Sequence, residues 1–234
     1  DMVSRGLGDV YKRQILASSI FVPFIFTFHK RLSFHHHFKS LAFGLILMLS
    51  IFIPWDIWFT ENGIWGFNEY YISGIYLLNL PLEECLFFIC IPFCCIFTYH
   101  VVWTLSNDKS FNPMKNVSFI LSLILFSCGI FWMDKLYTFY TFIGLSIMLL
   151  IAPFTVNMKI FFKAFVILLV PFFIVNGLLT GSFIENQVVW YNDNHNLGIR
   201  LFTIPVEDIF YNCFMLLLVM IGYQKTLSIK KVTF

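Results

Sequence analysis

The sequence predicts an all-α fold: a polytopic membrane helix bundle of about seven transmembrane helices with a parallel internal repeat. Hydrophobic residues make up 59% of the 234 positions and charged residues 12%, about half the charged fraction of a typical soluble domain. The mean hydropathy is +0.81. Long apolar stretches recur along the chain, and an acidic motif occurs twice. These observations together exclude an ordinary soluble domain.

The apolar stretches define seven candidate spans, because a helix needs about 20 predominantly apolar residues to cross the hydrocarbon core. The candidates are 15–28, 40–59, 80–105, 117–133, 137–154, 160–180 and 201–222. We expect helices there, since a single spanning segment must satisfy its backbone polar groups internally. The shorter, alternating strands of a membrane barrel are not evident in the sequence.

The first fourteen residues differ from the rest of the chain. The stretch DMVSRGLGDVYKRQ is polar and charged, and it resembles translated adapter sequence. We therefore expect 1–14 to be a non-native leader and leave it out of the fold reasoning. On this interpretation the first helix, which begins at Ile15, is truncated.

The distribution of Lys and Arg predicts the orientation, because cytoplasmic loops carry an excess of these residues. Alternate connections and the C-terminal tail hold ten of them, and the opposite connections hold two, Lys135 and Arg200. The ten are Lys30, Arg31, Lys39, Lys109, Lys115, Lys159, Lys163, Lys225, Lys230 and Lys231. We therefore expect the N-terminus outside and the C-terminus in the cytoplasm.

Two long connections, 60–79 and 181–200, lead into a repeated pattern, N-x5-G-I-x5-P-x-E-[ED]. Asn68, Gly74, Ile75, Pro81, Glu83 and Glu84 recur, each 124 positions later, as Asn192, Gly198, Ile199, Pro205, Glu207 and Asp208. An offset that crosses four spans restores the chain direction, which predicts a parallel repeat about an axis along the membrane normal. We expect the first repeat at 15–105, a connecting span at 106–136 and the second repeat at 137–234.

The acidic motifs have two interpretations. Proline and acidic residues in a first helical turn are a common way to begin a helix. However, Glu83, Glu84, Glu207 and Asp208 lie within apolar sequence, and acids inside a membrane are costly and usually functional. Two like motifs at one depth can converge on one pocket, so these four are our catalytic candidates. Neighbouring helix positions point about 100° apart, and the sequence leaves open which member of each pair faces the pocket.

Polar and aromatic residues near the motifs are candidates for substrate binding. Asp56 ends the second span, either as a hydrogen-bonded helix-end residue or as part of the pocket. Aromatic faces can stabilise a cation, and interfacial anchoring accounts equally well for most of these rings. The candidates are Asp56, Trp65, Asn68, Trp190, Tyr191, Asn192 and Tyr211.

These residues resemble the lycopene cyclase domain family of bacterial and fungal type. The resemblance rests on the run from Trp55-Asp56 through 63–68 to 79–84, and on a second copy at 198–208. It covers nearly all of 15–225, with two halves that are separate subunits in some bacteria fused in one chain. It implies an isomerase, or intramolecular lyase, that converts the ψ-ends of lycopene to β-rings, giving γ-carotene and β-carotene in carotenoid biosynthesis.

The implied reaction needs a general acid, a dry aromatic cavity and a base. A buried carboxyl group can keep its proton near neutral pH and act as the acid. The implied partners are lycopene or a similar linear carotenoid, membrane lipid and other carotenoid-pathway enzymes. The resemblance also implies a multi-pass protein of the bacterial cytoplasmic membrane. A net charge of +2 gives no indication of nucleic acid binding, and the sequence indicates neither a cofactor nor a metal.

Other classes of seven-span protein fit less well. A retinal protein needs a lysine in its last span, and 201–222 has none. A membrane prenyltransferase would carry a D-x-x-x-D motif, which no span contains. A proton-coupled transporter stays the alternative, since parallel repeats and intramembrane acids suit it, although no pair of broken half-helices is evident. A non-catalytic carotenoid-binding protein is the third interpretation.

Overall fold

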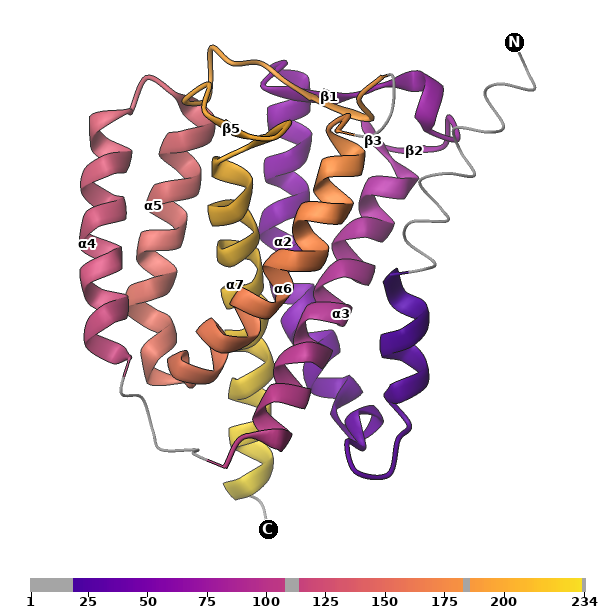
Figure 1. Ribbon diagram of the computed structural model, residues 1–234, viewed down its shortest axis with the longest axis vertical. Coiled ribbons are helices and arrows are strands. Elements are labelled where there is room, and N and C mark those ends of the chain that lie inside the picture. The colour runs from indigo at the N-terminus through magenta and orange to yellow at the C-terminus, as the bar shows by residue number, and fades with distance from the viewer. Residues whose placement is uncertain (1–18, 108–113, 183–185, 233–234) are drawn as a thin grey trace.

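The computed structural model describes residues 19–107, 114–182 and 186–232, which form a bundle of helices (Figure 1). Residues 19–26 are helical, and the leader 1–14 and the start of the first predicted span lie outside the described residues. The remaining helices are η1 (Phe34–His37), α2 (Phe38–Glu61), η2 (Glu69–Tyr71), α3 (Leu82–Leu105), α4 (Lys115–Phe131), α5 (Leu136–Ile151), η3 (Ala152–Phe154), α6 (Met158–Leu179) and α7 (Glu207–Val232).

The predicted all-α membrane bundle is confirmed. Five segments are long and apolar enough to cross a membrane, and α4, with 17 residues, is a shorter apolar helix. The five are Phe34–Glu61, Leu82–Leu105, Leu136–Phe154, Met158–Leu179 and Glu207–Leu227. The predicted start of the last span at residue 201 is wrong, because residues 200–205 form a hairpin and α7 begins at Glu207.

Short strands cover the end of the bundle where α3 and α7 begin (Figure 1). The strand β1 (Trp65–Phe67) pairs antiparallel with β4 (Val189–Tyr191). Two tight hairpins follow, one formed by β2 (Tyr76–Leu77) and β3 (Leu80–Pro81), the other by β5 (Arg200–Leu201) and β6 (Ile204–Pro205). Each hairpin leads directly into α3 or α7.

The backbone has the same conformation at equivalent positions of the two loops that carry the repeated motif. Leu78 and Phe202, 124 residues apart, both begin their hairpin turns with left-handed φ values of 59° and 57°. Gly74 and Gly198 precede the hairpins with φ values of 74° and 69°, a region that glycine enters without steric cost. The two halves therefore share one local fold, and an approximate two-fold axis relates α3 to α7 and α2 to α6. The exact repeat boundaries stay a prediction.

The pairing of β1 with β4 lies on this two-fold axis. Gly66 pairs with Trp190, its own counterpart at the 124-residue offset, and the pairs on either side exchange under that offset. A Cβ atom at residue 66 would overlap the Trp190 indole, so only glycine lets the ring pack there. The pairing of β1 with β4 thus joins the two repeats at the end of the bundle where α3 and α7 begin.

Candidate active site

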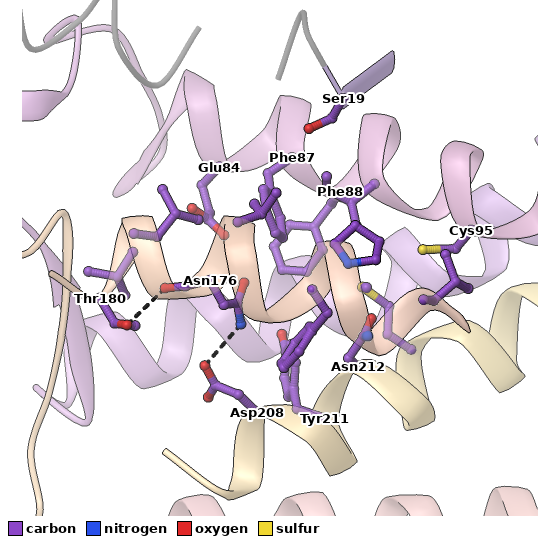
Figure 2. A pocket seen from close by; sticks show the side chains of 18 of the residues that line it. Ser19, Glu84, Phe87, Phe88, Cys95, Asn176, Thr180, Asp208, Tyr211 and Asn212 are labelled. Carbon is purple, nitrogen blue, oxygen red and sulfur yellow. Dashed lines mark hydrogen bonds between the residues drawn. The ribbon is translucent and has the colours of Figure 1, made fainter. Parts of the chain in front are cut away.

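A cavity of about 270 Å³ lies between α3, α6 and α7, beneath the β1–β4 pair. Its acidic and tyrosine side chains come from the starts of α3, α5 and α7, the end of α2 and strand β4. Its opposite end is lined by apolar residues and by Ser19, Cys94, Cys95 and Thr98. Figure 2 shows Glu84 and Asp208 approaching the cavity from α3 and α7, with Asn176 between them in this view. The cavity therefore has two parts. We call the part around Asp56, Glu84 and Asp208 the acidic chamber, and the part that continues toward Thr98 the apolar extension.

The cavity is elongated along α3. The α3 residues that line it lie three or four positions apart, which places them on one face of the helix. They are Glu84, Phe87, Phe88, Ile91, Cys94, Cys95 and Thr98. From Glu84 to Thr98 this face extends about 21 Å, at about 1.5 Å per residue. An elongated groove of this kind fits a linear hydrocarbon better than a compact ligand.

Glu83 and Glu207 are not among the residues that line the cavity. Each accepts a hydrogen bond from the backbone of the loop ahead of its own helix. Glu83 Oε1 accepts from the Ser73 N–H at 3.3 Å, and Glu207 Oε1 accepts from the Leu197 N–H at 2.8 Å. Thr138 also donates to Glu207 Oε1, at 2.6 Å. Both side chains are buried, and the two equivalent bonds hold the loop against the helix start.

Glu84 and Asp208 do line the cavity, so the structure distinguishes the members of each acidic pair. Asp208 receives three hydrogen bonds. Tyr137 Oη donates to Oδ1 at 2.6 Å, Tyr191 Oη to Oδ2 at 2.9 Å and Asn176 Nδ2 to Oδ2 at 3.2 Å. A set of three donors is complementary to an ionised carboxylate, which can only accept.

Asp56 and several aromatic side chains also line the acidic chamber. Trp65 Nε1 donates to Asp56 Oδ1 at 2.6 Å. The Tyr211 ring lies 5.8 Å from Trp65 and 6.1 Å from Tyr137, and its buried hydroxyl has no hydrogen-bond partner among the described residues. Burial raises the pKa of the Tyr191 hydroxyl well above its usual value, and the nearby Asp208 and Glu84 raise it further. Tyr191 therefore stays a hydrogen-bond donor.

The other predicted binding residues, Asn68, Trp190 and Asn192, do not line the cavity. Asn68 Nδ2 donates to the Gln187 carbonyl at 3.2 Å, and Asn192 Nδ2 donates to the Gly63 carbonyl at 3.3 Å. Each asparagine thereby joins its own repeat to the other, and Trp190 packs over Gly66. Their repetition along the sequence reflects this assembly of the two halves, and the structure does not bring them to the candidate site.

Sequence reasoning missed Tyr137 and Asn176, which both hydrogen-bond Asp208. Asn176 carried a usable signal, because it is an amide inside the apolar span predicted at 160–180 and polar groups there tend to have a specific partner. Tyr137 carried no such signal, because it is the first residue of a predicted span and tyrosines at that position are commonly interfacial anchors.

Comparisons with known proteins find sequence similarity to one family. A family model described as lycopene cyclase matches residues 13–102 and 134–226, one region in each repeat. A curated protein from Leptosphaeria maculans, "Bifunctional lycopene cyclase/phytoene synthase", is 29% identical over 77 residues. That alignment covers 32% of this chain and 12% of the relative, so the chain matches only a small part of its length. No solved structure matches the chain.

Proposed function

The chain belongs to the lycopene cyclase family, and from this premise we propose that it converts the ψ-ends of lycopene, or of a similar linear carotenoid, to β-rings by acid catalysis. The products would be γ-carotene and then β-carotene. One observation carries the proposal beyond the family match: two carboxyl groups from equivalent positions of the repeats, Glu84 and Asp208, line one aromatic cavity inside a membrane bundle.

The chemistry is an isomerisation in which one proton enters and another leaves. A proton added to the terminal double bond of the ψ-end produces a tertiary carbocation. The next suitably placed double bond attacks this carbon, which closes the six-membered ring and moves the positive charge into it. Loss of a ring proton then leaves the β-ring double bond. The protein must therefore supply an acid, a base and a dry cavity between them.

Glu84 is the proposed acid and Asp208 the proposed base. The three hydrogen-bond donors around Asp208 stabilise its ionised form. An ionised Asp208 could accept the departing proton, and its negative charge would attract the cation. At the positions equivalent to Asn176 and Tyr191, the first repeat has Phe52 and Phe67, whose side chains cannot donate. The two acids thus have different surroundings, as an acid and a base of one site require. Return of the proton from Asp208 to Glu84 completes the cycle.

The aromatic rings of the chamber have a proposed role in the cation step. Trp65, Phe87, Tyr137, Tyr191 and Tyr211 all line the cavity. The negative faces of such rings attract a cation within about 6 Å, and the effect strengthens when water is excluded. A cation held this way is protected from water, which would otherwise add to it and give an alcohol.

The orientation is also a proposal. The connection that contains Lys30 and Arg31 lies at the same end of the bundle as the described end of α7, opposite the acidic chamber (Figure 1). The excess of Lys and Arg that cytoplasmic loops usually carry supports a cytoplasmic location for that end. In a bacterial cytoplasmic membrane, the chamber would lie toward the outer face.

Expression in a lycopene-accumulating host tests the function. Chromatography and mass spectrometry of the pigments should show a product of unchanged mass with one or two β-rings. The Asp208→Asn variant, inserted to the same level, is the matched control and should leave lycopene unconverted. Unchanged lycopene with the well-inserted parent protein would contradict the proposal, and a product heavier by one water would indicate a hydratase instead.

A further inference from the structure

The acidic chamber lies on the two-fold axis of the repeat. Many of its lining residues occur as pairs separated by 124 positions, one from each half, although Tyr137 and Asn176 have no lining counterpart. The helical pairs are Glu84 and Asp208, Phe87 and Tyr211, Phe88 and Asn212, and Ile91 and Met215. Both repeats therefore contribute residues at equivalent helix positions to this part of the cavity.

The apolar extension lies off the axis. It continues from the chamber between α3 and α6, past Val175, Leu168, Cys95 and Thr98. If the molecule were fully symmetric, a second groove would run between α7 and α2, past the residues at the equivalent positions. None of those counterparts, which are Ile51, Gly44, Val219 and Gly222, lines the cavity.

Two glycines close the second groove. Gly44 of α2 and Gly222 of α7 let the two backbones touch, and a Cβ atom on Gly222 would lie 2.8 Å from the Gly44 Cα. A Cβ atom on Gly44 would overlap the Val219 carbonyl oxygen. The equivalent positions on α6 and α3 are Leu168 and Thr98, which both carry side chains and line the open groove. A helix contact with small residues thus seals one groove and leaves the other open.

We infer that the described residues form one groove for the polyene, along α3 and α6, and that each binding event presents one end of the substrate to the acids. The inference rests on the proposed function. A linear polyene with one end in the chamber extends down the open groove, and the sealed α2–α7 contact prevents it from passing through. Its second end reaches Glu84 and Asp208 only after the molecule has left the groove and entered again reversed.

An isotope chase tests this inference. The protein is reconstituted in lipid vesicles with deuterium-labelled lycopene, and excess unlabelled lycopene is added once labelled monocyclic product has accumulated. We expect labelled bicyclic product to form more slowly after the chase, by the factor by which unlabelled lycopene dilutes the labelled molecules. The reason is that the released labelled monocycle must compete with unlabelled lycopene for the groove. Release of a monocyclic product that is not converted further also agrees with the inference. Labelled bicyclic product that keeps forming at the rate before the chase would overturn it.

Failure of the proposed function is distinguishable in the same experiment, since it yields no cyclised product from inserted protein. A matched pair of variants then locates the groove. Val175 lines the groove, whereas Ile51, its counterpart on α2, is 42% exposed on the outside of the bundle. We expect Val175→Phe to lower the initial cyclisation rate roughly tenfold, because it overfills the groove, and Ile51→Phe to stay within about twofold of the parent protein. Equal losses in variants that insert equally would overturn the assignment of the groove.

Discussion

The hydrogen bond from Tyr137 to Asp208 offers a quantitative test of the candidate site. Its length of 2.6 Å, between buried groups, is that of a bond to a charged acceptor. Such a bond contributes about 1.5–3 kcal/mol, and deleting its donor leaves the carboxylate to two remaining partners. If that contribution is needed at the transition state, Tyr137→Phe lowers the cyclisation rate about 10- to 100-fold, at about 1.36 kcal/mol per factor of ten.

The assay is the initial rate of β-ring formation per inserted protein, with thermal unfolding in detergent measured alongside. Tyr140→Phe is the control, because it deletes the same hydroxyl group from the same helix at a side chain that is 41% exposed and lies outside the cavity lining. We expect this control to keep nearly the full rate. A Tyr137→Phe protein that cyclises lycopene at more than half the parent rate would refute the assignment of Asp208 as a carboxylate held for catalysis.

Two further predictions concern assembly and orientation. Gly66→Ala places a methyl group against the Trp190 indole at the junction of the repeats, and we expect it to cost about 1–3 kcal/mol of stability by overpacking; an unchanged unfolding temperature in detergent would count against the close contact. A reporter fused after Phe234 should be active in the cytoplasm, because the basic connections lie at that end; activity confined to the periplasm would reverse the proposed orientation.

The repeat could be predicted from the sequence because both copies carry the same backbone requirement. Gly74 and Gly198 occupy left-handed conformations, and Pro81 and Pro205 end the hairpin before each helix. Such residues leave a recognisable spacing in the chain. The start of α7 could not be predicted in the same way, because the hairpin residues Leu201 and Phe202 are as apolar as a span.

The choice between neighbouring acids also lay beyond sequence reasoning. Glu83 and Glu84 have the same chemistry, and what separates them is a backbone N–H at Ser73, placed by a loop whose path the sequence does not show. The single groove is a similar case. In the sequence nothing distinguishes Gly44 and Gly222 from other glycines. Their role follows only from the contact between the two helices that carry them.

We propose that Glu84 and Asp208 perform the proton transfers, whereas Glu83 and Glu207 hold the loops. Glu84→Gln, Asp208→Asn, Glu83→Gln and Glu207→Gln test it most directly, compared by β-ring yield at equal insertion. In the last two variants the amide oxygen can still accept the loop N–H, so we predict measurable cyclisation. The first two should lose activity by at least the factor of about 10²–10⁴ typical of acid–base residues. Near-normal yield from both Glu84→Gln and Asp208→Asn would contradict the account.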